Sequence, residues 1–214
     1  MNRIFLITRP KHDETTCYLF YWGNEVLRIA KKKGIQVLDL QKKRANKKEL
    51  VSIIKKKHPL LCFLNGHGGP DFVAGHSNEI LVKLGENEEI LNSKIVYALS
   101  CQSAKKLGIG SIKKGTIAYI GYDEDFVFTF KQGKLTRPAE DETASLFFKP
   151  SNQLIISLLK GHTIEFAYNK SQELFMKNIR KLLTSESPVD SSDAKYLWWD
   201  MRHQVCLGDK KATF

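Results

Sequence analysis

The sequence contains few cysteines and no long apolar stretch. Its 214 residues include only four cysteines, without the paired spacing of a disulfide framework. The first apolar run, residues 4–7, is too short for a signal peptide, and no later run reaches the length of a membrane span. We therefore expect a cytoplasmic protein with free thiols and no contact with a membrane.

Motifs for common cofactors are missing as well. The chain has no C-x-x-C cluster and no pair of histidines at the spacing of a metal site. It also has neither a G-x-G-x-x-G loop nor a Walker loop to bind phosphates. The sequence therefore predicts no metal ion and no organic cofactor.

Acidic residues are scarce at the start of the chain, where positive charge gathers. Residues 1–60 hold 15 Lys and Arg against 5 Asp and Glu, in a chain of net charge +11. Such a basic face can attract nucleic acid or an acidic partner. No aromatic residue interleaves with the lysine bursts, for example at 31–33 and 55–57, to stack on bases. We favour solvated helix faces, and nucleic-acid binding stays open as an alternative.

Two short apolar runs organise the rest of the chain. Residues 60–64 are followed by His67 among glycines, and residues 95–99 are followed by Cys101. Unbroken apolar runs bounded by small residues are typical of strands buried on both faces of a parallel sheet. In open α/β sheets, ligands gather beyond the carboxyl ends of the strands. If the two strands are neighbours, His67 and Cys101 face each other across one crevice.

This pair of residues suits nucleophilic catalysis. A cysteine attacks as its thiolate, and a nearby imidazole can take the proton. The backbone N–H groups of Gly68 and Cys101 can hold a developing oxyanion. Residues 102–107 predict a helix whose N-terminus would lower the pKa of the thiol. The alternative is that Cys101 is a small buried residue and His67 a turn residue, but their positions after separate strands favour catalysis.

Two further residues near His67 have an open role. Asp71 is expected either to orient His67 or to cap the turn in which it lies. His76 is a second candidate base, in a polar turn where we expect it to be exposed. This turn separates two segments, 72–75 and 80–82, that predict a hairpin.

The remaining pattern predicts one α/β domain over residues 1–214. Strands alternate with helices before His67, as in a right-handed parallel sheet. A further strand lies beside the cysteine strand, and the last third is mostly helical. The expected strands are 3–8, 35–40, 115–122 and 203–207, and the expected helices are 14–33, 46–57, 143–148, 152–160 and 163–182.

These motifs resemble those of the caspase-like cysteine peptidases, which include caspases, legumain, gingipains and the CHAT-domain peptidases. Residues 63–68 resemble the histidine motif of the gingipain and CHAT side, and residues 96–103 resemble its cysteine motif. Residues 158–167 and 205–209 resemble the helix junction and the last strand that follow. The resemblance implies a caspase-like three-layer sandwich, with a mostly parallel central sheet and helices on both faces. It also implies a cysteine endopeptidase with a Cys-His dyad.

The resemblance also suggests a substrate pocket. In the resembled family, the segment after the strand that corresponds to 115–122 walls the pocket for the residue before the scissile bond. We therefore expect Tyr122, Asp123 and Asp125 to contact substrate, with the carboxylates paired to Arg or Lys. The alternative is an acidic loop that caps the next element.

Residues 131–138 form a basic loop, which in this family suggests self-cleavage during activation. The expected partners are a protein or peptide substrate and a regulatory protein. Two other functions remain open: a catalytically silent caspase-like binding or scaffold module, and a basic nucleotide-binding or nucleic-acid-binding α/β domain.

Overall fold

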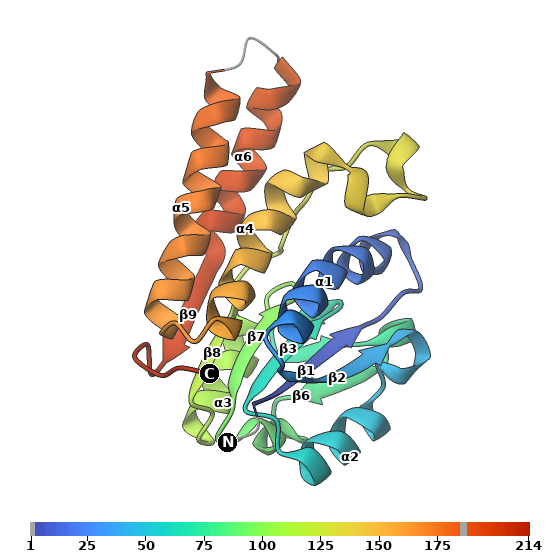
Figure 1. Ribbon diagram of the computed structural model, residues 1–214, viewed down its shortest axis with the longest axis vertical. Coiled ribbons are helices and arrows are strands. Elements are labelled where there is room, and N and C mark those ends of the chain that lie inside the picture. Colours follow the sequence, from blue (N-terminus) through green and yellow to red (C-terminus); the bar gives the residue numbers. More distant parts are fainter. Residues whose placement is uncertain (1–2, 185–187) are drawn as a thin grey trace.

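A six-stranded sheet forms the centre of the computed structural model, which describes residues 3–184 and 188–214 (Figure 1). The strands of this sheet are β1 (Ile4–Arg9), β2 (Gln36–Gln41), β3 (Leu61–Asn65), β7 (Ile95–Leu99), β8 (Ala118–Tyr122) and β9 (Gln204–Gly208). Their order is β2-β1-β3-β7-β8-β9. All neighbouring pairs are parallel except β8 and β9, which are antiparallel. The predicted mostly parallel sheet is confirmed.

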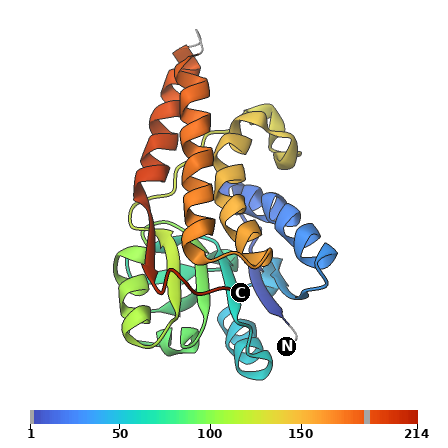
Figure 2. The ribbon, with the colours of Figure 1, turned by 60° about the vertical axis from the view of Figure 1, so that its left-hand side comes forward.

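Helices cover both faces of this sheet. The helices are α1 (Glu14–Lys32), α2 (Lys47–Lys57), α3 (Ile109–Lys113), α4 (Glu142–Leu159), α5 (Ile164–Leu183) and α6 (Pro188–His203). The first core contains side chains of α1, α4 and α5, and the second contains side chains of α2 and of the segment before α3. Helices α5 and α6 lie side by side and extend beyond the sheet (Figures 1 and 2). In the part of the chain that the structure describes, no helix combines the length and apolarity needed to cross a bilayer.

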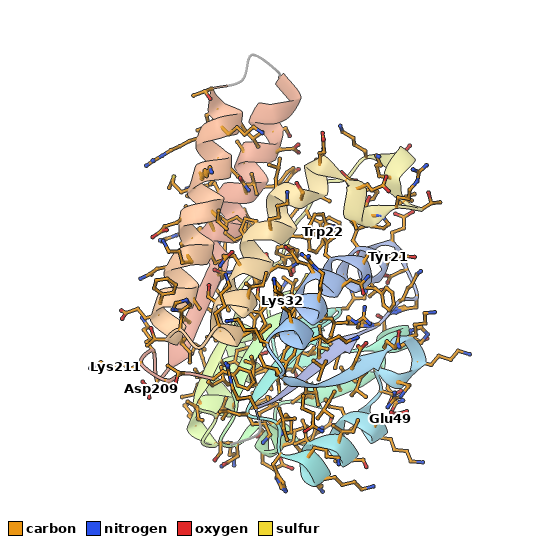
Figure 3. All side chains as sticks on the ribbon, viewed as in Figure 1. Tyr21, Trp22, Lys32, Glu49, Asp209 and Lys211 are labelled. Atoms are coloured by element: carbon orange, nitrogen blue, oxygen red, sulfur yellow. The ribbon has the colours of Figure 1, made fainter. Side chains whose placement is uncertain are left out.

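The two cores explain why the central strands are unbroken apolar runs. Phe63 and Tyr97 enter the core on the α1 and α4 side, whereas Cys62 and Val96 enter the core on the α2 side. Successive residues of a strand point to opposite faces, so a strand with helices on both sides needs apolar residues throughout. Side chains fill the spaces between the sheet and its helices (Figure 3).

A small antiparallel sheet follows His67. It consists of β4 (Gly68–Gly69), β5 (Phe72–Ala74) and β6 (Ile80–Lys83), in that order. The predicted hairpin is therefore confirmed, because β5 and β6 are antiparallel partners. This sheet places the glycines after His67 next to the end of β7.

One helix replaces two that the sequence predicted. Helix α4 continues through Pro150, where we expected a break between 143–148 and 152–160. A proline inside a helix costs about 3 kcal/mol. Each large apolar side chain that is fully buried contributes about 1.5–3 kcal/mol, and α4 buries several, including Phe148 and Leu154. Burial along the whole helix thus outweighs the cost of the proline.

Candidate active site

His67 and Cys101 lie at the same edge of the sheet because β3 and β7 are paired. The register joins Asn65 to Leu99, and each candidate residue follows its strand by two positions. The N–H of Gly66 also donates to the carbonyl oxygen of Leu99 at 3.4 Å, which keeps the two chains together beyond the strand ends. The prediction that these strands are neighbours is confirmed.

Gly68 lies against the backbone of Cys101. A Cβ atom at Gly68 would lie 2.6 Å from the carbonyl oxygen of Cys101, so only glycine fits without a shift. The N–H of Ala74 donates to the carbonyl oxygen of His67, which makes Gly68 and Val73 the non-hydrogen-bonded pair of the β4–β5 ladder. The N–H of Gly68 consequently points away from β5.

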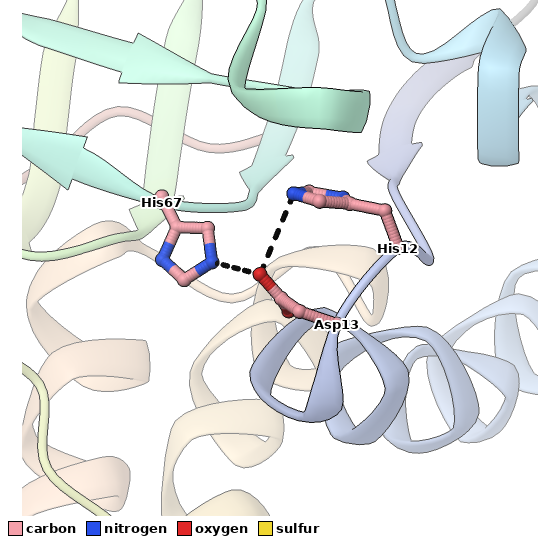
Figure 4. A group of neighbouring side chains, drawn as sticks. All are labelled: His12, Asp13 and His67. Carbon is pink, nitrogen blue, oxygen red and sulfur yellow. Dashed lines mark hydrogen bonds and ion pairs between the residues drawn. The ribbon is translucent and has the colours of Figure 1, made fainter.

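The acidic partner of His67 comes from a distant part of the chain. Its Nε2 atom lies 2.6 Å from Oδ2 of Asp13, the N-cap residue of α1, 54 positions away. Oδ1 of Asp13 accepts hydrogen bonds from the N–H of Thr16 at 2.8 Å and from its hydroxyl at 2.7 Å. Oδ2 is therefore left to face the imidazole (Figure 4). We infer a proton on Nε2, which leaves Nδ1 of His67 as the basic nitrogen.

Hydrogen bonds affect the pKa of the Asp13 carboxyl more than burial does. Burial would raise the pKa of this carboxyl, but the hydrogen bonds from Thr16 and His67 and the charge of His67 lower it to about 2. The carboxylate is therefore ionised at neutral pH. An ionised carboxylate beside an imidazole orients the ring and stabilises its protonated form.

Sequence reasoning missed Asp13 and offered Asp71 as the orienting acid. In the structure the carboxylate of Asp13 contacts His67, whereas the carbonyl oxygen of Asp71 accepts from the N–H of Leu84, directly after β6. The predicted parallel sheet nevertheless contained information that could have identified Asp13. Strand β1 pairs with β3 in parallel, so the residues after β1 reach the same edge as His67.

Buried polar contacts fix the ends of β1 and β3. The amide of Asn65 donates to the carbonyl oxygen of Thr8 at 2.8 Å, and the Thr8 hydroxyl donates back to the Asn65 carbonyl at 3.1 Å. The buried guanidinium of Arg9 donates two hydrogen bonds to Asp39, at 2.6 and 2.9 Å. Such bidentate, charge-assisted contacts are among the stronger ones in proteins. They hold in place the ends of β1 and β3, which lead into the Asp13 loop and the His67 loop.

Cys101 is held as a neutral thiol. Burial, with the nearby Asp125 carboxylate as a second cause, raises its pKa to about 11. Its Sγ atom lies 3.9 Å from the carbonyl oxygen of Phe126, which can accept the thiol proton. The prediction that a helix N-terminus lowers this pKa is wrong. Gln102 adopts a left-handed conformation (φ 57°), and the helical turns begin only at Ala104.

The acidic residues after β8 already have partners within the chain. Their contacts are Asp123 with His203 at 2.8 Å, Glu124 with Lys105 at 2.6 Å and Asp125 with the Gln102 amide at 2.9 Å. These contacts fix the segment beside the thiol. A basic substrate side chain would have to compete with them for the carboxylates.

Tyr122 lies in the core. Its side chain has no exposed surface, and its hydroxyl lies 3.2 Å from the Ser151 hydroxyl and accepts from the Gln204 amide at 3.1 Å. This corrects the expectation that Tyr122 contacts substrate. The reason is register, because the last residue of β8 is still paired with β9 and points into the first core.

Helix α6 holds the segment that covers Cys101. The indole N–H of Trp199 donates to the carbonyl oxygen of Asp125 at 2.9 Å, and the N–H of Val127 donates to the buried carboxyl of Asp200 at 2.9 Å. Burial raises the pKa of Asp200 well above its ordinary value. Residues 123–129 are therefore attached to α6.

The other candidate base, His76, belongs to a cluster around Asp13. It is half-buried, its Nδ1 accepts from the N–H of Lys11 at 3.4 Å, and its ring lies 5.2 Å from that of His12. Burial, with the charges of His12 and Lys43 as further causes, lowers the pKa of His76. The donor atoms of His12, Asp13 and His67 all lie within 4.8 Å of one another, so these three residues could hold a metal ion.

Comparison with known proteins identifies the fold. No protein-family model and no curated protein sequence matches this chain. Among solved structures, the Arg-specific cysteine proteinase gingipain R (RgpB) matches with a TM-score of 0.65 and 9% identity, over 99% of this chain and 47% of that chain. A complex of the pro- and mature domains of Porphyromonas gingivalis RgpB matches with a TM-score of 0.59 and 9% identity, over 98% and 48%.

This chain thus spans about half the length of the gingipain chains that it matches. The likeness confirms the predicted caspase-like α/β architecture, in which helices flank a mostly parallel sheet. At this level of identity it establishes the fold alone.

Proposed function

We propose that this chain is a cysteine endopeptidase in which Cys101 is the nucleophile, His67 the base and Asp13 the residue that orients the base. One observation carries the proposal: an Asp–His pair and a cysteine follow neighbouring parallel strands at one edge of the sheet. The likeness in fold to a cysteine proteinase supports it. The placement near the gingipain and CHAT groups rests on the sequence motifs.

The reaction begins with transfer of the thiol proton from Cys101 to Nδ1 of His67. The thiolate attacks the carbonyl carbon of the scissile bond, and the N–H groups of Gly68 and Cys101 stabilise the oxyanion. His67 then gives its proton to the leaving amine, and the acyl group remains on sulfur as a thioester. A water molecule, deprotonated by His67, releases the acid and restores the thiol.

This mechanism requires a change around Cys101 before the thiolate can form. Burial and the nearby Asp125 carboxylate both raise the pKa of the thiol and so favour its neutral form. Displacement of the 123–129 segment by a regulatory protein, or cleavage within 131–138, would expose the sulfur. Leu135 of this loop lines the same hollow as Asp13 and Cys17, which puts it near the base.

The acidic segment suggests a preference for a basic residue before the scissile bond. Asp125 is exposed and lies beside the nucleophile, and Asp123 is partly exposed. A substrate Arg or Lys that pairs with Asp125 would remove the negative charge that disfavours the thiolate. Binding of the preferred substrate would thus help to activate the cysteine.

Labelling with peptide acyloxymethyl ketones that carry Arg, Lys, Asp or Leu next to the reactive group tests the proposal. Intact mass spectrometry would compare the wild type with His67→Ala, Cys101→Ala and Cys17→Ala, the last removing a thiol that is not the proposed nucleophile. We expect one adduct, lost in the first two variants and retained in Cys17→Ala. Equal labelling of all exposed thiols by iodoacetamide, with no adduct from any ketone even after limited proteolysis of the loop, would favour a binding module. Salt-dependent binding to nucleic acid would then be the next measurement.

A further inference from the structure

Three side chains around the proposed base form a donor set that fits a divalent transition metal. His12 Nε2 lies 3.4 Å from Asp13 Oδ2, and the same oxygen lies 2.6 Å from His67 Nε2. Figure 4 shows both rings directed at this carboxylate oxygen. Two imidazole nitrogens and one carboxylate oxygen are a set that zinc accepts, with water in the fourth position.

The three donor atoms are already close together, because they all lie within 4.8 Å of one another. In a tetrahedral zinc site with bonds of about 2.0–2.2 Å, neighbouring donor atoms lie roughly 3.3–3.6 Å apart. The separation between His12 and Asp13 already has this value. The shorter separation between His67 and Asp13 is that of a hydrogen bond, whose proton the ion would replace. The side chains of His67 and Asp13 are 35% and 39% exposed, so an ion can reach them from solvent.

Contacts outside the donor set orient these ligands. Both donors of Thr16 hold Oδ1 of Asp13 and leave Oδ2 free for an ion. The Nδ1 atom of His12 lies 3.4 Å from the Thr16 hydroxyl, and its ring packs edge-on against His76. Oriented imidazoles with a hydrogen bond on the distal nitrogen are typical of metal sites, where such partners tune affinity. The sequence showed no metal spacing because His67 joins the pair 12–13 only through the fold.

We propose that His12, Asp13 and His67 bind a zinc ion that inhibits the enzyme. The binding itself does not depend on the proposed peptidase function, whereas the inhibition does. Zinc on Nε2 leaves the single ring proton of His67 on Nδ1, so that nitrogen has no lone pair for the proton of Cys101. The ion also neutralises the Asp13 carboxylate that would stabilise a protonated His67. Removal of the ion would restore the base.

Direct binding is tested with cobalt(II) as the spectroscopic probe, followed by displacement with zinc. Wild type and Cys101→Ala should both show the visible absorption of tetrahedral cobalt. His12→Ala should bind at least about tenfold more weakly. The control is His162→Ala, which removes an exposed histidine at the α4–α5 junction and should bind like the wild type.

Two results would contradict the proposed metal site. The first is unchanged cobalt affinity in His12→Ala. The second is a sulfur-to-cobalt charge-transfer band that disappears in Cys17→Ala, because Cys17 lines the same hollow and would then be the ligand.

The inhibitory effect has a separate readout. The rate at which the best ketone probe labels Cys101 would be measured with and without zinc, and the ratio of the two rates compared among variants. Zinc should slow labelling at least tenfold in the wild type and leave the ratio near one in His12→Ala. Labelling that zinc leaves unchanged, at concentrations that saturate the cobalt site, would refute inhibition. Cobalt binding without labelling by any probe, even after limited proteolysis of the 131–138 loop, would refute the peptidase and leave the metal site standing.

Discussion

The two halves of the candidate active site are built differently. On the His67 side, the imidazole is partly exposed and bonded to a carboxylate whose pKa is lowered to about 2. On the Cys101 side, burial and Asp125 raise the pKa of the thiol to about 11, and the sulfur faces a carbonyl oxygen. The proposed base is thus bonded to an ionised carboxylate, whereas the proposed nucleophile is held as a neutral thiol. Under the proposed function, activation would have to act on the surroundings of Cys101.

The difference follows from which elements support each half. The His67 loop and the Asp13 loop leave neighbouring central strands whose ends are joined by buried hydrogen bonds. The segment over Cys101 follows the sheet's last parallel strand and is attached to α6. The central part of the sheet gives the base a fixed geometry. The segment beside Cys101 is held instead by hydrogen bonds to α6.

The largest expected effect comes from a change on the His67 side of the site, at Asp13. Asp13→Asn should still cap α1, because an asparagine oxygen accepts from Thr16, but it removes the charge that stabilises protonated His67. We expect labelling of Cys101 by the ketone probe to slow by about 10²–10⁴-fold, as when the orienting carboxylate of a triad is neutralised. In Thr16→Val the hydroxyl contact to Oδ1 is lost while the charge stays, so labelling should change much less. Similar losses in both variants would mean that Asp13 acts only as a cap.

The contact between the two halves is tested at Gly68. In Gly68→Ala the new Cβ would lie 2.6 Å from the Cys101 carbonyl oxygen, so the two loops must separate. Such overpacking costs about 1–3 kcal/mol, and a urea titration should report this loss together with a loss of labelling. The matched control is Gly133→Ala, where a Cβ meets no atom within 4 Å. Wild-type stability and labelling in Gly68→Ala would show that the loops are not in contact in solution.

The Cys101 side of the site is tested with a substitution of Asp125. Asp125→Asn removes the negative charge beside the thiol, so the pKa of Cys101 should fall and its thiolate fraction at about pH 8 should rise. Burial, the larger cause of the raised pKa, remains, so we expect alkylation by iodoacetamide to accelerate by only about three- to tenfold. Rates would be read by mass spectrometry of the Cys101 peptide. Glu124→Gln is the control, because Glu124 pairs with Lys105; an equal acceleration there would argue against a local effect of Asp125.

The smallest effect concerns acid stability. The pKa of Asp13 is lowered in the folded protein from 3.8 to about 2, so its contribution is fully present well above pH 3.8. It is lost as the pH falls toward 2. Because Asp13 is partly exposed, solvent screening reduces this contribution to on the order of 1 kcal/mol. Urea titrations from about pH 5 to pH 2 should show a shallower loss of stability in Asp13→Asn than in the wild type. Parallel curves would contradict the lowered pKa.

Much of this fold could be predicted because the informative segments are local. The apolar residues at 61–64 and 95–99 are buried on both faces, and the small residues that follow them mark the strand ends that carry His67 and Cys101. Thr163 could be recognised as the start of a helix because its side chain caps α5 at the expected position. Proximity of the two candidate residues then follows from one assumption, that the strands are neighbours.

What could not be predicted depends on contacts between distant segments. The sequence around Asp13 identifies a helix cap, but its second role requires the pairing of β1 with β3. The pKa of Cys101 is set by residues 125–126, which sequence patterns cannot place against the thiol. Continuity of α4 through Pro150 reflects burial against α1 and α5, which outweighs the local preference of proline.

The attachment of residues 123–129 to α6 has a mechanical consequence. Asp193, Trp199 and Asp200 hold this segment at three points along α6, and the helix then passes directly into β9 at the edge of the sheet. A helix of 16 residues is a rod about 24 Å long. A displacement of α6 would therefore reach the segment beside Cys101 through these three hydrogen bonds, by a route that does not include β1 or β3, the strands that precede Asp13 and His67.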